Sequence, residues 1–309
     1  MSLHRLNSIT IGVPALTQTS AYYEEFGLVR EDDGWFATSV GGRQLKLVHA
    51  PTRRLLELSI GADSPDDLQS IASRLTRLGV ESNVDEHRLI AVEPATSVRV
   101  EVAVTARATQ PVTPAPLYNG PGREERGTTR APGVLREGLV RPRKLGHVVI
   151  GSTDQVATQR FFTEGIGLKI SDEIVGTAAF LRCSTDHHNV LVQSAPVNFV
   201  HHTSWEVDDV DEVGRGAMQM LEGNPERHVW GMGRHTVGSN FFWYLKDPAG
   251  NFCEYYSDLD CIVDDALWTP RVWDGGLEKT LMSWGPPVPP SLLKPEDLAA
   301  LMVGAHSVQ

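Results

Sequence analysis

The 309-residue chain is poor in cysteine, in long apolar runs and in positive charge. Its three cysteines, Cys183, Cys253 and Cys261, lack metal-type spacing and favour a reducing compartment over a disulfide framework. No apolar run reaches the roughly 18 residues that span a bilayer. Lys and Arg number 28 against 39 Asp and Glu, a net charge of −11. An acidic chain lacks the basic surface that phosphate groups require, which argues against nucleic acid or an anionic membrane as partner.

The N-terminal sequence also lacks the pattern of a secretory signal, because MSLHRLNSIT has no apolar stretch followed by a small-residue cleavage site. Together with the cysteine content, this predicts a cytoplasmic protein. With 41% apolar and 22% charged residues, the composition is that of a folded chain of about two domains.

The sequence contains two similar halves. RLNSITIGVPALTQTSAYYEEFGLV in the first resembles KLGHVVIGSTDQVATQRFFTEGIGLKI in the second, which places Ser8 opposite His147. Between them, a segment rich in Pro, Gly, Arg and Thr is interpreted as a connector. The predicted organisation is an N-terminal module (1–105), the connector (106–143), a C-terminal module (144–260) and a Trp- and Pro-rich tail (261–309).

Each half repeats one order of elements twice: a strand, a helix and three strands. Strands are predicted from Val, Phe, Trp and Tyr enrichment, and helices from apolar spacing and acidic starts such as Asp208 to Asp211. The expected helices span 17–26, 65–78, 154–165 and 209–222. The expected strands span 6–13, 34–40, 43–49, 54–60, 88–93, 98–104, 145–151, 168–174, 177–183, 189–194, 199–207, 227–233, 240–246 and 252–257. This predicts an α+β protein in which each module pairs two βαβββ units and curls eight strands into a partly open barrel around a cavity.

Histidine is concentrated in the second half, where seven of the 11 lie between His147 and His235. His147, His202 and Glu254 stand on three different predicted strands. Two imidazoles and one carboxylate are the donor set of a facial triad, which leaves positions open on non-haem Fe(II). Each of these residues alone is also compatible with a structural role. Because neighbours on a strand face opposite sides, only one of His201 and His202 is expected to face the cavity.

The most specific pattern is GRHTVGSNFFWYLKDPAGNFCE, which ends at Glu254 and contains His235, Tyr244, Asp247-Pro248 and Gly250. It resembles the signature of type I extradiol ring-cleaving dioxygenases of the vicinal oxygen chelate superfamily. Other segments of the chain are similar to this family too, and the resemblance covers roughly residues 5–260. These segments are Gly146-His147, Asp186-His187-His188 and His201 to Val207.

The resemblance implies three metal ligands, His147, His202 and Glu254. It also implies that His188 is the acid–base group on the oxygen side, and that His235 and Tyr244 hydrogen-bond the substrate oxygens. The implied activity is insertion of both atoms of O2 into a substituted catechol at Fe(II), with Mn(II) as the alternative metal. Such an enzyme serves aromatic-compound degradation, and the family resemblance implies a homo-oligomer.

Other functions on the same fold are a hydroquinone-cleaving dioxygenase, a glyoxalase-like isomerase and a metal-free binding protein of the bleomycin-resistance type. An isomerase does not need His188, His235 and Tyr244, and a metal-free protein does not need the ligand set. The N-terminal module carries Ser8, Glu57 and either Val100 or Glu101 at the ligand positions. We therefore interpret it as a structural repeat without the metal site.

Three finer expectations concern orientation. His187 and His188 should face opposite sides of one strand, with His188 on the face of Val190 and Val192. Trp243 should point away from the cavity that Phe242 and Tyr244 face. The tail, which contains Trp268, Trp273 and Trp284, lies either over the barrel mouth or as a strap at an interface.

Overall fold

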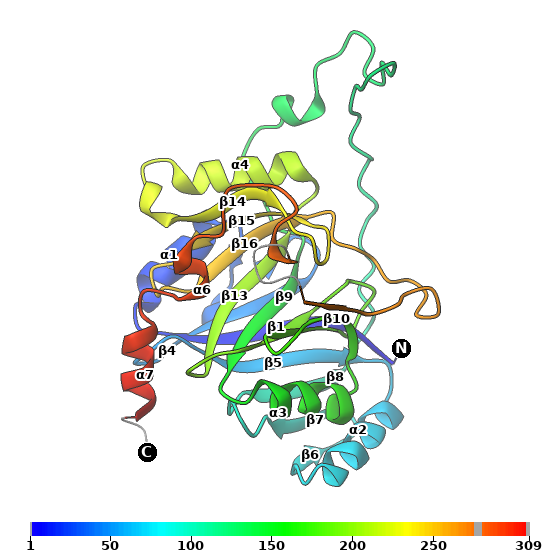
Figure 1. The fold of residues 1–309 in the computed structure, drawn as a ribbon, viewed down its shortest axis with the longest axis vertical. Coiled ribbons are helices and arrows are strands. Elements are labelled where there is room, and N and C mark those ends of the chain that lie inside the picture. Colours follow the sequence, from blue (N-terminus) through cyan, green and yellow to red (C-terminus); the bar gives the residue numbers. More distant parts are fainter. Residues whose placement is uncertain (1, 275–279, 307–309) are drawn as a thin grey trace.

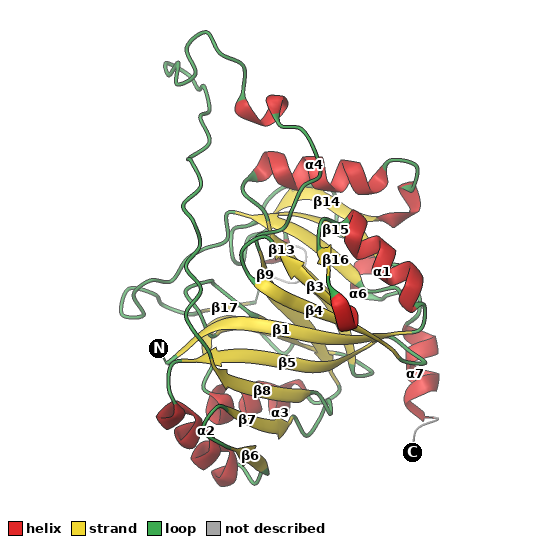
Figure 2. Ribbon diagram, turned by 180° about the vertical axis from the view of Figure 1, so that it is seen from behind, coloured by secondary structure: helices red, strands yellow, loops and turns green. Residues whose placement is uncertain are grey.

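The structure is a computed structural model that describes residues 2–274 and 280–306, and these residues form two open β-sheets (Figures 1 and 2). The N-terminal sheet contains β1 (Leu3–Val13), β2 (Val29–Arg30), β3 (Trp35–Thr38), β4 (Gly42–His49), β5 (Arg54–Ala62), β6 (Ser82–Val84), β7 (Arg88–Val92) and β8 (Arg99–Val104). The C-terminal sheet contains β9 (Lys144–Ser152), β10 (Lys169–Ile174), β11 (Ala178–Arg182), β12 (Val190–Ser194), β13 (Phe199–Glu206), β14 (His228–Arg234), β15 (Phe241–Lys246), β16 (Phe252–Ser257) and β17 (Arg271–Trp273).

The helices lie outside the sheets (Figure 2). They are α1 (Leu16–Glu25), α2 (Pro65–Arg77), α3 (Gln155–Arg160), α4 (Val210–Leu221), α6 (Pro290–Leu293) and α7 (Leu298–His306), with short turns η1 (Asp32–Gly34), η2 (Pro132–Leu135) and η4 (Pro225–Arg227). The π-helical turn η3 (Phe161–Ile166) continues α3. Helix α4 begins as the acidic pattern predicts, because the side chain of Asp209 accepts the backbone N–H of Glu212.

Four βαβββ units build the two sheets, which confirms the predicted α+β class and the tandem repeat. In every unit the first strand pairs parallel to the fourth, as in β1 with β4 and β9 with β12. The first strands of paired units, β1 with β5 and β9 with β13, run antiparallel and join the units. Over the described residues the N-terminal sheet ends at β2 and β6 and the C-terminal sheet at β14 and β17, so both remain open.

Three short strands were not predicted individually. β2 and β6 contain two and three residues, too few for a period-two pattern. β17 belongs to the tail and pairs with β10, so the C-terminal sheet has nine strands instead of the expected eight. β17 is held by tertiary contacts, because Asp172 accepts hydrogen bonds from the backbone of Arg271 and from the indole of Trp273.

One continuous hydrophobic core joins the two modules. The ring of Phe26 stacks on Tyr255 with centroids 3.9 Å apart, and the Tyr255 hydroxyl donates to the Phe26 carbonyl at 2.7 Å. The Tyr23 hydroxyl lies 3.1 Å from Sγ of Cys253. Cys253 and Tyr255 flank Glu254 on β16 and therefore face the side opposite to it. The N-terminal module thus supports the strand that carries Glu254 from behind.

The connector extends away from both sheets before it returns along α4 (Figures 1 and 2). Its two ends meet, because the Arg143 guanidinium donates to the Pro111 carbonyl at 2.8 Å. On its return, Arg136 pairs with Asp209 at 2.6 Å and Val140 is buried. Of the helices described, none is both long enough and apolar enough to cross a membrane.

Candidate functional site

His147, His202 and Glu254 converge inside the C-terminal sheet. They lie on the adjacent strands β9, β13 and β16, and their ligand atoms all lie within 4.8 Å of one another. Nε2 of His147 is 3.2 Å and Nε2 of His202 is 3.7 Å from Oε2 of Glu254. Register explains the meeting, because Ser204 on β13 pairs with His147 on one side and with Glu254 on the other.

Glu254 is a fully buried carboxylate that accepts hydrogen bonds at both oxygens. Oε2 accepts a hydrogen bond from Ser204 Oγ at 2.6 Å, and Oε1 accepts one from Asn240 Nδ2 at 3.1 Å. Burial acts to raise the pKa of Glu254, but hydrogen bonding with His147 and His235 holds this pKa well below its usual range. Within the described residues its ion-pair contacts are to histidines and to no Lys or Arg. A buried anion without a fixed cation, beside two imidazoles, fits a divalent metal bound through N and O donors.

Ser204 and Asn240 were not predicted as site residues. Ser204 lies within the predicted strand two residues after His202, and Asn240 precedes the Phe-Phe-Trp-Tyr strand. A serine and an asparagine near a strand end carry no specific signal, and only the fold brings both to Glu254.

Two of the proposed ligands, His147 and His202, open onto a cavity of about 160 Å³. His188, His235 and Tyr244 line it together with His147 and His202. Much of the remaining wall is apolar, and no Lys, Arg, Asp or Glu contributes to it among the described residues. The apolar side chains come from two parts of the chain: Val149, Ile174, Ala178, Phe180, Leu191, Trp230 and Val237 from the module, and Leu281, Leu292 and Leu293 from the tail. Described residues of the tail therefore line the cavity, as the first of its two predicted positions requires; residues 275–279 and 307–309 lie outside the described residues.

His235 and Tyr244 form a hydrogen-bonded pair beside Glu254. Nδ1 of His235 contacts the Leu281 carbonyl, and Nε2 lies 3.0 Å from the Tyr244 hydroxyl. Because a carbonyl only accepts, Nδ1 of His235 carries a proton. Burial, and then the negative charge of Glu254, raise the pKa of Tyr244 well above its usual value. Tyr244 therefore stays protonated.

His188 lies in the cavity wall, but not on a strand. His187 and His188 belong to the loop between β11 and β12, and their Nδ1 atoms are 3.1 Å apart. The predicted opposite facing is therefore wrong. The predicted face is also wrong, because Val190 and Val192 enter the core while Leu191 faces the cavity. Asn189 shapes this loop, since its Oδ1 accepts the backbone N–H groups of Cys183 and Ser184.

The two rings of this pair have different surroundings. The ring centroid of His188 lies 4.1 Å from that of His147. Burial, and then the neighbouring His147, lower the pKa of His188 well below its usual value, so this imidazole is neutral. His187 is fully buried, with Nε2 3.6 Å from Asp172 and its ring against Trp268.

His201 and His202 both line the cavity, which corrects the prediction that only one of them faces inward. The pairing of β13 with β9 moves from Val200 opposite Ile150 to His202 opposite Val149, so His201 is the extra residue of a β-bulge. The bulge brings the two Nδ1 atoms to 2.7 Å. Burial lowers the pKa of His201 to about 4.

Trp243 lies on the opposite face of β15 from the cavity, as predicted. It packs against the core, while Phe242 and Tyr244 belong to the separate cluster beside the tail. The Trp243 indole donates to Nδ1 of His228 at 3.0 Å. His228 is exposed at the start of β14 and is not among the residues that line the cavity.

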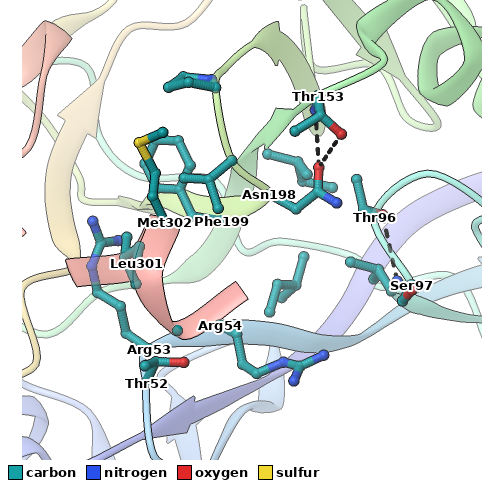
Figure 3. Close-up of a pocket in the computed structure, with 16 residues that line it drawn as sticks. Thr52, Arg53, Arg54, Thr96, Ser97, Thr153, Asn198, Phe199, Leu301 and Met302 are labelled. Carbon is teal, nitrogen blue, oxygen red and sulfur yellow. Dashed lines mark hydrogen bonds between the residues drawn. The ribbon is translucent and has the colours of Figure 1, made fainter. Parts of the chain in front are cut away.

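A larger hollow of about 400 Å³ lies between the two modules and α7 (Figure 3). Figure 3 shows Asn198 turned toward Thr153, whose backbone N–H donates to its side chain at 2.9 Å. Arg53 is already engaged, with the Val200 carbonyl at 2.5 Å and Asp297 at 2.6 Å. None of the predicted site residues lines this hollow, so the smaller cavity is the candidate site.

Comparison with known proteins agrees with this fold. Residues 144–255 match the Glyoxalase/Bleomycin resistance protein/Dioxygenase superfamily. The C-terminal module is a domain of this superfamily. The Mn(II)-bound glyoxalase from Novosphingobium aromaticivorans superposes with a TM-score of 0.74 at 24% identity, covering 93% of both chains. At that identity the likeness establishes the shared fold, which extends beyond the superfamily domain into the N-terminal module.

Two curated proteins are also similar in sequence. Metapyrocatechase 2 of Cupriavidus necator is 38% identical over 178 residues, which are 57% of this chain and 53% of that protein. The iron-dependent extradiol dioxygenase of Rhodococcus jostii (strain RHA1) is 28% identical over 157 residues, or 46% of this chain and 50% of that protein. The chain thus spans about half the length of the curated relatives that it matches.

Proposed function

We propose that the protein is an extradiol dioxygenase that inserts both atoms of O2 into a catechol-type vicinal diol. His147, His202 and Glu254 would hold a single Fe(II), with Mn(II) as the alternative. The observation that carries the proposal is the convergence of these three buried donors beside one cavity, whose wall contains His147, His202, His188, His235 and Tyr244. The similarity to a metapyrocatechase and to an iron-dependent extradiol dioxygenase supports this assignment.

The bound metal would supply a Lewis acid for the diol and a binding position for oxygen. Side chains of the protein would bind the substrate, transfer the proton and exclude water. Tyr244 and His235 are placed to hydrogen-bond a substrate oxygen beside Glu254. His188 is neutral and faces the same cavity, so it is able to accept a proton from the diol and return it later in the reaction. The apolar wall limits the access of water.

The cavity wall also indicates the substrate class. Its apolar residues and the lack of a Lys or Arg among the described lining residues favour a neutral, hydrophobic substituent on the catechol ring. A carboxylate on that substituent would be buried without a cation, which is costly. We therefore propose a substituted catechol from aromatic-compound degradation as the substrate.

The remaining proposals concern organisation. We infer that residues 1–105 are a structural module without a metal site, joined by the connector 106–143 to the catalytic module 144–260. The tail 261–309 completes the cavity through its described residues. We also propose a cytoplasmic homo-oligomer, on the basis of the cysteine content and of exposed apolar side chains such as Val134 and Leu135.

The test uses protein purified without oxygen and loaded with Fe(II) or with Mn(II). Oxygen uptake and the yellow ring-opened product are measured with catechol, an alkylcatechol, an arylcatechol and a carboxylated catechol. We expect one metal per chain, turnover of the vicinal diols and poor turnover of the carboxylated one. Turnover of hydroquinones alone would assign the hydroquinone-cleaving activity. Metal-dependent isomerisation without oxygen uptake would assign a glyoxalase-like function, and ligand binding without any metal would assign a binding protein.

A further inference from the structure

A short chain of hydrogen bonds connects the C-terminal tail to the proposed ligand His202. The carbonyl oxygen of Leu292, in α6, lies 2.6 Å from Nε2 of His201. Nδ1 of the same ring lies 2.7 Å from Nδ1 of His202. All three residues are buried.

The donor of each hydrogen bond in this series follows from the Leu292 carbonyl at its start. A carbonyl oxygen accepts only, so Nε2 of His201 must carry a proton. A neutral imidazole has one N–H, which leaves Nδ1 of His201 as an acceptor. Nδ1 of His202 must then be the donor at 2.7 Å, and Nε2 of His202 is left with a free lone pair. That nitrogen is the one that faces Glu254, at 3.7 Å from Oε2.

We propose that His201 is a positioning residue that transmits the orientation of the Leu292 carbonyl to His202 and fixes the tautomer in which Nε2 of His202 binds the metal. The inference rests on the proposed function, because it concerns a ligand of the proposed metal centre. It adds a role for the tail, whose backbone takes part in preparing a ligand as well as in closing the cavity.

The fold holds both ends of this series of hydrogen bonds in place. The β-bulge at His201 turns its ring to the same side as His202, which regular strand alternation would prevent. Arg53 fixes the strand and the tail together, since Nη1 donates to the Val200 carbonyl at 2.5 Å and Nε and Nη2 reach Asp297 at 2.6 and 2.9 Å. The Arg53 side chain is 1% exposed and that of Asp297 is 34% exposed, so the arginine side of this clamp is buried. Groups that orient a metal-bound histidine through its second nitrogen contribute about 10–100-fold to metal affinity.

A matched pair of variants tests the proposal. Asn and Leu have similar size, but only Asn in His201→Asn keeps an oxygen near the position of Nδ1 that accepts the His202 N–H. The dissociation constants of Fe(II) and Mn(II) are measured without oxygen by competition with a chelator, alongside the unfolding free energy of the metal-free proteins. We expect His201→Leu to weaken metal binding by about 10–100-fold, and His201→Asn, which keeps the acceptor but loses the contact with Leu292, to weaken it by less. Equal metal affinity of the two variants would overturn the proposal.

The tautomers are also measurable in the unmodified protein, which avoids any loss of folding in the variants. Long-range ¹H–¹⁵N spectra of the metal-free wild type distinguish protonated from bare ring nitrogens. We expect a protonated Nδ1 on His202 and a protonated Nε2 on His201, and the reverse pattern would overturn the proposal. Wild-type protein that binds neither Fe(II) nor Mn(II) would refute the proposed function instead, so the two failures are distinguishable.

Discussion

Glu101 on β8 and Glu254 on β16 occupy equivalent positions in the two sheets. Each lies opposite a serine of the neighbouring parallel strand, Ser59 on β5 and Ser204 on β13. The two serines donate to their carboxylates at 3.2 and 2.6 Å. The register therefore selects Glu101, rather than Val100, as the counterpart of Glu254.

The surroundings of the two carboxylates differ in the source of positive charge. Glu101 lies 3.6 Å from Arg88 and 3.9 Å from Arg99, and Arg99 also pairs with Glu57, the counterpart of His202. In the N-terminal module arginines thus neutralise the acidic positions. Around Glu254 the neighbours are histidines, which leave room for a metal ion as the cation.

This pair gives a matched test of the metal site. We expect Glu254→Ala to abolish both metal binding and turnover, because it removes one of three ligands and the only carboxylate among them. Glu101→Ala should retain one metal per chain and full turnover. Metal content is measured by elemental analysis after anaerobic loading. Full metal retention in Glu254→Ala, or two metals per wild-type chain, would contradict the assignment.

The second prediction separates the two histidines of the loop between β11 and β12. Replacement of His188 by Gln should leave metal content and catechol binding nearly intact, because the His188 ring lines the cavity outside the ligand cluster. Turnover should fall by about 10²–10⁴-fold, the usual contribution of a positioned acid–base group. His187→Gln is the control and should affect stability more than turnover, since His187 is fully buried beside Asp172 and Trp268. If turnover fell in His187→Gln and not in His188→Gln, the acid–base role would belong to His187.

The third prediction concerns Asn240, which holds the Glu254 oxygen that lies away from the two ligand histidines. Asn240→Leu keeps the size of the side chain and removes the donor, so the carboxylate loses its fixed orientation. We expect metal affinity to fall by about 10-fold or more. Asn198→Leu, at an amide outside the site, serves as the control for general destabilisation. Unchanged metal affinity in Asn240→Leu would show that Ser204 alone is sufficient to orient Glu254.

The sequence predicted the repeated units well because their apolar patterns are local and occur four times. It placed His147, His202 and Glu254 on three strands, which the fold makes neighbours. The prediction from the sequence failed where the pairing of strands departs from the regular alternation of side chains. The bulge at His201 and the loop at His188 depend on contacts with β9 and on the side chain of Asn189, neither of which leaves a local pattern. The position of the tail depends on side chains such as Asp172 and Arg53 that are far away in sequence.

The fourth prediction concerns assembly. Large apolar side chains of the connector are exposed in the single chain, including Val112 at 97%, Val134 at 72% and Leu135 at 61%. Association of chains would remove such side chains from water. Light scattering at micromolar concentration should give a mass of two or more times 33.9 kDa. A stable monomer under these conditions would contradict the proposed homo-oligomer.

The last prediction uses Asp247, which lies in the turn between β15 and β16 and is 3% exposed. Its carboxylate accepts the backbone N–H groups of Ala249 and Asn251, both at 2.9 Å. Burial nevertheless raises the pKa of Asp247 to about 6. The pKa of an Asp in an unfolded chain is about 3.9, so between these two values the folded state binds the proton more strongly.

The free energy of unfolding contributed by Asp247 therefore falls as the pH rises from about 4 to about 6, and it stays low above that range. Asp247→Asn does not titrate and resembles the protonated form. From near pH 5 to near pH 8, the unfolding free energy of Asp247→Asn relative to wild type should rise by about 1.4 kcal/mol. Urea unfolding of both metal-free proteins at the two pH values measures this difference, in which the shared histidines cancel. A constant difference would mean that the Asp247 carboxyl has the same pKa in the folded and unfolded states.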